Sequence, residues 1–272
     1  METSQKDYNI SLSDVVFINR IRRNNCIVVY TAFWRHQLVF VKEIIGEERS
    51  VFNEIRVLTK CIHPKIVQFL GFSNNFMFFE YMEHGDLQEY ISKHKTMITR
   101  IHKVNMMKDI TIALHYLHNR RPNGVIHRDL KPQNILVNKN GDVKLADFDV
   151  SKLVETSETD KYKGHTGETG TYVWTSPEVL RHETYNYTAD IYSLGLLFYY
   201  VWTCKTPFEH LQMCPIQIAF AKIQNTIQIP IISEDLFLSS IIQQCCIYDK
   251  NKRPSTELVI GLLNKIPNLK NL

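Results

Sequence analysis

The sequence predicts an α+β protein in which a small antiparallel β-rich lobe is followed by a larger helical lobe. Residues 15–41 are dominated by β-branched and aromatic side chains, as in VVFI, CIVVYTAF and LVFV, which predicts consecutive antiparallel strands. Beyond Gly85 the apolar residues recur at helical spacing through the rest of the chain. The lobes should meet near Met82 to Gly85 with a cleft between them, so we assign residues 1–82 to the first lobe and 83–272 to the second.

The composition is that of an ordinary globular protein. Hydrophobic residues make up 44% and charged residues 22% of the 272 residues, and the net charge of +4 is spread along the chain without a block of one sign. The first residues lack an apolar signal region, and the longest apolar run, at residues 194–204, is too short to span a bilayer. Six cysteines without metal-ligand spacing indicate reduced thiols. We therefore expect a soluble, intracellular protein of the cytoplasm that binds neither nucleic acid nor membrane.

Apolar spacing also predicts the elements between the first strands and the helical lobe. Two apolar runs, IVQFLGF and FMFFEYM, predict strands on either side of a turn at residues 73–75. Before them, residues 47–62 predict a helix with an apolar stripe formed by Val51, Ile55, Leu58 and Ile62. The first long helix of the second lobe should end before the break at residues 122–124, and its apolar face comprises Ile101, Val104, Ile110, Leu114 and Leu117.

The most specific motif is VIHRDLKPQNILV at residues 125–137, followed by LADFD at residues 145–149. With these motifs the chain resembles the eukaryotic protein kinase family over about residues 14–267. The resemblance implies a two-lobed protein kinase fold with ATP and Mg²⁺ as cofactors. It implies that Asp129 is the catalytic base and that Asn134 and Asp147 hold the metal.

Phosphoryl transfer explains why these residue types occur together. An aspartate must accept the proton of the substrate hydroxyl, while an amide oxygen and a carboxylate hold magnesium against the phosphates. Any one of these side chains alone would more often be a turn or capping residue, so the order of several landmarks carries the assignment. Two more are Lys42, which matches the phosphate-holding lysine, and Glu54, which matches its glutamate partner. The twelve-residue step between Lys42 and Glu54 is short, which indicates a trimmed loop.

Landmarks of the second lobe support the same family. TGTYVWTSPEVL at residues 169–180 resembles the end of an activation segment, with Ser-Pro-Glu where Ala-Pro-Glu is usual. The resemblance implies that Glu178 pairs with Arg253 and that Asp190 anchors the backbone of the catalytic loop.

The acceptor is expected to be a protein serine or threonine hydroxyl. Lys131 stands where serine/threonine kinases carry a lysine, and Thr171 agrees with this interpretation. Arg128 could bind a phosphate on the activation segment, and a regulatory protein partner is compatible with that arrangement. The hydroxyl groups available on the segment are those of Thr156, Ser157, Thr159, Tyr162, Thr166 and Thr169.

The nucleotide site departs from the family pattern. Arg22, Asn24 and Ile27 stand at the positions of the Gly-rich loop, and no glycine occurs before Gly46. Glycines matter there because a backbone without Cβ lies close over phosphates. The basic residues Arg20, Arg22 and Arg23 could approach phosphates by charge instead. The nucleotide contacts that the resemblance implies are Ile21, Val29, Phe40, Lys42, Phe79, Glu80, Met82, Asp86 and Leu136.

Phe40 is the second departure, because the family pattern Val-Ala-x-Lys places a small alanine in the roof of the adenine site. The ring could fill the adenine slot between Val29 and Leu136 and join the lobes without nucleotide, or it could turn aside and open the cleft. Phe79 narrows the pocket further, and Asp149 replaces the glycine that normally follows the phenylalanine.

The function that we expect is therefore that of an ATP-dependent serine/threonine protein kinase. The alternative is a pseudokinase, which is a binding module with weak or no ATP binding. A kinase of small molecules is less favoured, because the full activation segment suits a protein substrate.

Overall fold

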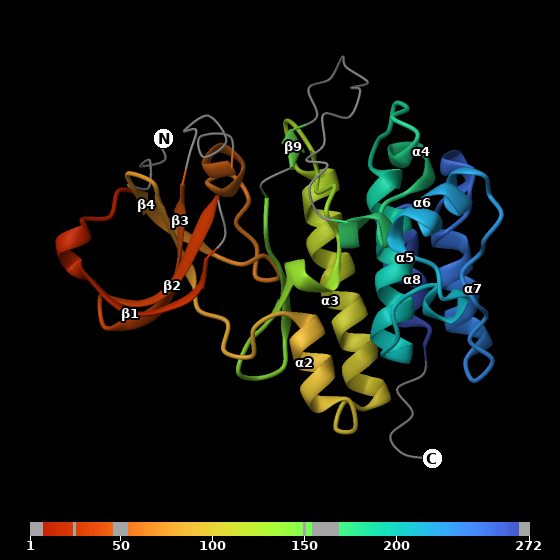
Figure 1. Cartoon of the computed structure of the whole chain (residues 1–272), viewed down its shortest axis with the longest axis horizontal. Coiled ribbons are helices and arrows are strands. Elements are labelled where there is room, and N and C mark those ends of the chain that lie inside the picture. Colours follow the sequence, from red (N-terminus) through yellow and green to blue (C-terminus); the bar gives the residue numbers. More distant parts are fainter. Residues whose placement is uncertain (1–7, 24–25, 46–53, 149–150, 154–168, 267–272) are drawn as a thin grey trace.

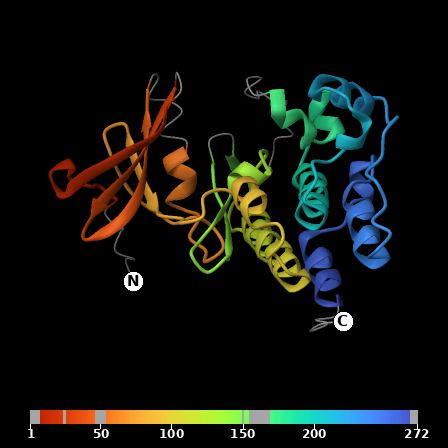
Figure 2. The same ribbon diagram turned by 60° about the horizontal axis from the view of Figure 1, so that its bottom comes forward.

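The protein forms a β-sheet lobe and a helical lobe, which the computed structural model places side by side (Figure 1). The second view shows the sheet, in red and orange, clearly apart from the helices, in yellow to blue (Figure 2). This arrangement confirms the predicted α+β class. The structure describes residues 8–23, 26–45, 54–148, 151–153 and 169–266.

The first lobe is built on one antiparallel sheet with the strand order β1-β2-β3-β5-β4. Tight turns join its hairpins: Arg35 and His36 have φ values of 49° and 61°, and Asn74 has 51°. The strands predicted from β-branched and aromatic runs are confirmed, except that residues 66–68 of IVQFLGF lie outside the strand. The strands are β1 (Val15–Arg23), β2 (Ile27–Trp34), β3 (Gln37–Ile44), β4 (Phe69–Ser73) and β5 (Phe76–Glu80).

The alternation of side chains along β3 and β5 divides the sheet into two faces. Val39, Val41 and Phe78 join a cluster on the outer face. Phe40 and Phe79 belong to the opposite face, where they pack against the large core cluster that continues into the helical lobe. Lys42 follows Phe40 by two residues on β3, so the strand presents the lysine on the same inner face.

The helix after β3 ends earlier than the sequence predicts. Residues 54–58 are helical, and Val57, Leu58 and Cys61 are buried. The prediction for Ile62 was wrong, because its side chain is 64% exposed. The helix gives way to a turn at residues 59–60, so helical spacing no longer governs position 62. Val51 lies outside the described residues.

The second lobe is organised around two long helices, α3 (Arg100–Asn119) and α5 (Thr188–Thr203), which pack against each other. On α3 the predicted face is buried except for Ile101, which is half-buried. Residues 189–202 of α5 are all buried, as expected of a helix that is apolar all round. The surrounding helices are α2 (Leu87–His94), α4 (Pro177–Leu180), α6 (Pro215–Ile223), α7 (Leu236–Cys245) and α8 (Thr256–Asn264).

Short strands line the side of the second lobe that meets the sheet. They are β6 (Val125–Ile126), β7 (Ile135–Val137), β8 (Val143–Leu145) and β9 (Lys152–Leu153), which form the pairs β6-β9 and β7-β8. Leu136 of β7 bridges Asp86, and the Val137 amide donates to the carbonyl of Gly85 at 2.8 Å. Among the described residues, no helix is both long and apolar enough to cross a membrane.

Candidate active site

A buried ion pair links the sheet to the short helix that follows it. Lys42 Nζ lies 3.1 Å from Glu54 Oε2 and 3.2 Å from Oε1. The residues are 9% and 2% exposed, so each charge depends on the other for compensation. Lys42 Nζ also lies 3.9 Å from Asp147 Oδ1. Three charged side chains from distant parts of the sequence therefore meet.

The loop between β6 and β7 holds Asp129 between an amide and an ammonium group. Asn134 Nδ2 donates to the carbonyl and to Oδ2 of Asp129, both at 2.8 Å. Lys131 Nζ lies 2.8 Å from the same Oδ2 and 3.4 Å from Thr171 Oγ1. The Ala146 amide donates to the Asn134 carbonyl at 2.9 Å, which fixes this loop beside the segment that carries Asp147.

Asp190 anchors the backbone of the same loop, which confirms the role expected of it. Its carboxylate accepts the backbone amides of His127 and Arg128 at 2.9 and 2.8 Å, and His118 Nε2 lies 2.9 Å away. Arg128 has a φ of 71°, a conformation that these bonds stabilise. Burial by itself would raise the pKa of Asp190, but the bonds and nearby histidines hold that pKa below its usual value. The Arg128 side chain donates to Tyr185 Oη at 2.8 Å.

Asp147 lies next to a buried aromatic side chain. Phe148 is 1% exposed, and its ring packs edge-on against His127 with centroids 5.2 Å apart. Asp147 adopts a φ of 62°, and its side chain remains 39% exposed. The buried Phe148 fixes the backbone here while the Asp147 carboxylate stays exposed, as expected of a residue that binds a ligand.

The metal-binding prediction concerns Asn134 and Asp147. The described part of the chain contains no group of three or more His, Cys, Asp or Glu residues that could hold a metal by itself. Magnesium does not need one, because it is commonly bound through one or two protein ligands together with water and substrate phosphates. The amide nitrogen of Asn134 is turned to Asp129, which leaves the amide oxygen as its donor to a cation. This donor set fits magnesium that arrives with a nucleotide.

Several of the predicted nucleotide contacts come together on the inner face of the sheet and on β7. The rings of Phe40 and Phe79 meet edge-on with centroids 6.4 Å apart. Both rings and Leu136 pack against the same core cluster. Asp86 pairs with Leu136 and caps α2 by accepting the Glu89 amide at 2.9 Å. Burial raises the pKa of Asp86.

Other predicted contacts are less enclosed or turned away. The Glu80 carboxylate lies 2.6 Å from Lys144 Nζ and accepts a hydrogen bond from the backbone amide of Gln68, so its side chain is bound by other residues of the chain. Met82 is buried, whereas Ile21 is 55% exposed at an irregularity in β1. Val29 is half-buried and lies opposite Lys42 in the β2-β3 ladder. Asn24, Asp149 and the hydroxyl side chains of Thr156, Ser157, Thr159, Tyr162, Thr166 and Thr169 lie outside the side chains that the structure describes.

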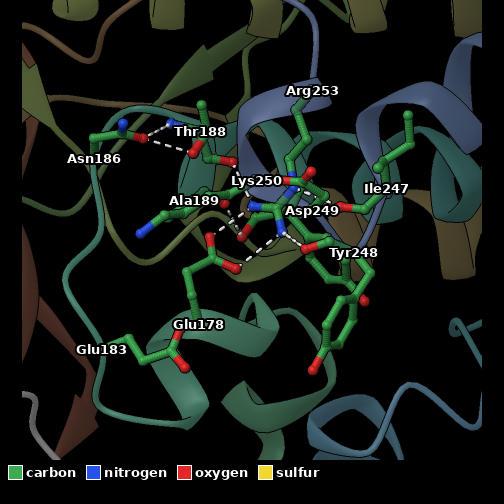
Figure 3. Close-up of polar contacts among 12 residues, drawn as sticks. Glu178, Glu183, Asn186, Thr188, Ala189, Ile247, Tyr248, Asp249, Lys250 and Arg253 are labelled. Carbon is green, nitrogen blue, oxygen red and sulfur yellow. Dashed lines mark hydrogen bonds and ion pairs between the residues drawn. The ribbon is translucent and has the colours of Figure 1, made fainter.

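The predicted pairing of Glu178 with Arg253 is confirmed. Their two hydrogen bonds measure 2.6 and 2.9 Å, and both side chains are almost completely buried. Figure 3 shows the guanidinium between this carboxylate and the backbone carbonyls of Thr188, Ile247 and Tyr248. Burial opposes the charge of Glu178, but Arg253 lowers the pKa of the carboxyl below its usual value.

Lys222 is a buried polar residue that the sequence motifs did not reveal. Its side chain is 2% exposed on α6 and donates to the carbonyls of Tyr172 and Val173 at 3.2 and 3.0 Å. A lysine in an amphipathic helix is usually a surface residue. The available signal was its position four residues after Ile218, which places it on the buried face of the helix.

Comparison with known proteins identifies the type of domain. The family model for the protein kinase domain matches residues 20–262. The serine/threonine-protein kinase VIK of Arabidopsis thaliana is 34% identical over 278 residues, and the match covers 96% of this chain. The serine/threonine/tyrosine-protein kinase HT1 of the same plant is 29% identical over 277 residues and 96% of this chain. A probable serine/threonine-protein kinase of Dictyostelium discoideum, drkC, is 32% identical over 267 residues and 93% of this chain. The matches span 62%, 68% and 35% of the lengths of these relatives.

Proposed function

The chain belongs to the protein kinase family, and on this premise we propose that it is an active serine/threonine kinase that transfers the γ-phosphoryl group of ATP to a protein hydroxyl. The observation that carries the proposal is the convergence of two charged groups of residues. Lys42 lies within 3.9 Å of both Glu54 and Asp147. Lys131 and Asn134 each contact the Asp129 carboxylate at 2.8 Å. Positioning and electrostatic stabilisation are the main demands of phosphoryl transfer.

Each residue has a distinct task in this proposal. The Asp129 carboxylate accepts the proton of the attacking hydroxyl, and the nearby Lys131 ammonium neutralises the negative charge that gathers there. Lys42 orients the phosphates, and Glu54 fixes the direction of its side chain. Asn134 and Asp147 would hold magnesium, which would offset charge on the phosphate oxygens.

The choice of a serine or threonine acceptor rests on Lys131 and its 3.4 Å contact with Thr171. The names of the plant and Dictyostelium relatives agree with it, although one of them also includes tyrosine. A cytoplasmic location and a regulatory protein partner belong to the proposal as well. All six cysteines are free thiols, which fits a reducing compartment.

Phe40 favours a second function, that of a pseudokinase acting as a binding module. Its ring lies on the cleft face of the sheet and contacts the core cluster shared by both lobes. A ring in the adenine slot would stabilise the closed lobes without nucleotide and would weaken ATP binding.

A titration with magnesium-ATP distinguishes the two functions. The melting temperature and the heat of binding are measured for the wild-type protein and for Asp147→Asn, which keeps the side-chain shape but lacks the negative charge. For the kinase we expect saturable stabilisation of the wild-type protein at millimolar nucleotide and a much weaker response of the variant. Equal responses of the two proteins, or none, would support the binding module.

A further inference from the structure

Lys222 is a buried cation whose partners are backbone carbonyls. It lies on α6, which packs against η3 (Thr169–Val173) and α4. Its Nζ donates to the carbonyls of Tyr172, Val173 and Thr175. A buried ammonium is costly unless its hydrogen bonds are satisfied, and these three carbonyls match its three donors.

The same lysine is the hydrogen-bond donor to three of the five backbone carbonyls of the segment 171–175. The Thr171 carbonyl accepts the Trp174 amide and the Thr175 hydroxyl at 2.9 and 3.0 Å. The Trp174 carbonyl accepts the Ser193 hydroxyl at 2.8 Å. The three remaining carbonyls all depend on Lys222. Because buried polar groups need partners, removal of the ammonium leaves this short segment without most of its external bonds.

The segment begins beside the catalytic loop. Thr171 at its start contacts Lys131, which in turn contacts Asp129. Glu178, the second residue of α4, is fixed by Arg253. Both ends are therefore attached to rigid parts of the second lobe, and Lys222 sets the path of the backbone between them.

We propose that Lys222 is a positioning residue for the protein substrate: its three bonds hold the segment 171–175 in the path that presents an acceptor hydroxyl to Asp129. The proposal rests on the proposed kinase function for its effect on catalysis. Its structural part, the dependence of the segment on one ammonium group, can be measured without activity.

The surroundings of Lys222 make its charge sensitive to pH. The titratable and charged groups that face it are Tyr192, with its ring centroid 4.9 Å from Nζ, Cys246, and the Glu178–Arg253 pair. Burial lowers the pKa of Lys222 to about 7, whereas burial raises that of Cys246 to about 12 and that of Tyr192 well above its usual value. Lys222 is therefore the member of this cluster that titrates near neutral pH. A neutral amine has two donors for three carbonyls, so the segment should loosen as the pH rises through 7.

The test compares Lys222→Met, Lys222→Arg and a control, Lys103→Met. Lys103 Nζ also donates to a carbonyl, that of Trp202 at 2.5 Å, and lies 5.7 Å from the Trp202 ring centroid, so its carbonyl partner lies outside the segment. Hydrogen–deuterium exchange of residues 171–175 is measured for all proteins. KM is measured for ATP and for the best acceptor in a synthetic library of serine and threonine peptides.

Lys222→Met should accelerate exchange in the segment about tenfold and raise the peptide KM by a similar factor, while the KM for ATP stays unchanged. Lys222→Arg should recover part of the protection, because a guanidinium keeps its charge and donates several hydrogen bonds. The wild-type peptide KM should rise about threefold between pH 6 and pH 8.5, and this rise should be absent in both variants. The control should match the wild type throughout.

Wild-type exchange in Lys222→Met would overturn the proposal, and so would peptide KM profiles against pH that are identical in wild type and Lys222→Arg. A wild-type protein that phosphorylates no peptide refutes the proposed kinase function instead, while the exchange measurement still decides the role of Lys222. If Lys222→Met fails to fold, the comparison of wild type with Lys222→Arg gives the same decision.

Discussion

Replacement of Phe40 with alanine tests the part of the cleft that departs most from the family pattern. The ring is half-buried on the inner face of β3 and meets Phe79 edge-on at 6.4 Å. We expect the variant to be less stable without nucleotide and to bind ATP more tightly. Both effects follow from one hypothesis, that the ring occupies the space of the adenine base.

The size of the first effect follows from the burial of the ring. Complete removal of a core phenyl group costs about 3–5 kcal/mol, and a half-buried ring beside an open cleft should cost about 2 kcal/mol. The edge-on contact with Phe79 contributes roughly 0.5–1.5 kcal/mol of that value. A loss of this size lowers the melting temperature by roughly 4–8 °C in a chain of this length.

The second effect is a gain in ATP binding. If the dissociation constant falls tenfold, saturating magnesium-ATP stabilises the variant by about 1.4 kcal/mol more than it stabilises the wild type. Nucleotide should therefore recover most of the stability that the substitution removes.

The assay is the melting temperature of both proteins with and without magnesium-ATP. Phe76→Ala is the matched control, because Phe76 is also half-buried and has an aromatic neighbour, Phe17, at 5.6 Å, but it packs on the outer face of the sheet. The control should lose stability without any change in its response to ATP. A Phe40→Ala protein whose apo stability and ATP response both match the wild type would refute the reasoning, and the missing glycines would then have to explain any weak binding.

Three further predictions address the catalytic group and the second lobe. Asp129→Asn should fold normally and transfer no radiolabel, because an amide cannot take the hydroxyl proton; equal incorporation by mutant and wild type would disprove this role. Phosphoamino-acid analysis should find the label on serine and threonine, and mainly phosphotyrosine would contradict the assignment based on Lys131. Glu178→Gln should lower stability at pH 7 by about 3–5 kcal/mol, because it leaves Arg253 buried without its partner. That difference in stability should shrink in melting curves below pH 4.5, the ordinary pKa of glutamate. Arg253 lowers the pKa of Glu178 in the folded state, and protonation at lower pH removes the charge from the wild type too. A difference that does not depend on pH would contradict this role of Glu178.

The strands were predictable because runs of β-branched and aromatic residues favour strands even where, as in β1, most side chains are exposed. The error at Ile62 has a local cause. Its apolar spacing continued the helical pattern, but the chain leaves the helix at residues 59–60, where the turn brings Cys61 into the core in its place. Apolar spacing predicts that a helix exists more reliably than it predicts where the helix ends.

The site was predictable to the extent that it lies in contiguous motifs. The pairing of Glu178 with Arg253 and the anchoring by Asp190 came from family landmarks, which fix the partners of a side chain across long sequence separations. Lys222 has no landmark. Its partners are backbone carbonyls 47 to 50 residues away, and carbonyls carry no identity in the sequence. A contact of this kind becomes visible only when the fold brings the two segments together.

Use of ATP requires residues that bind the phosphates and the hydroxyl, and a site that binds the adenine base. The contacts between Lys42 and Glu54 and between Asn134 and Asp129 are made within this chain, and they orient the residues that we propose for the phosphates and the hydroxyl. Phe40 changes a different part of the site, because its apolar ring packs against Phe79 and the core cluster. Affinity and turnover should therefore respond to different substitutions. Weak ATP binding would not by itself mark a pseudokinase, because a kinase with this cleft would reach its full rate once nucleotide saturates the site. Where the titration shows binding, the rate at saturating ATP measures turnover directly, and Phe40→Ala should lower the KM for ATP while leaving that rate nearly unchanged.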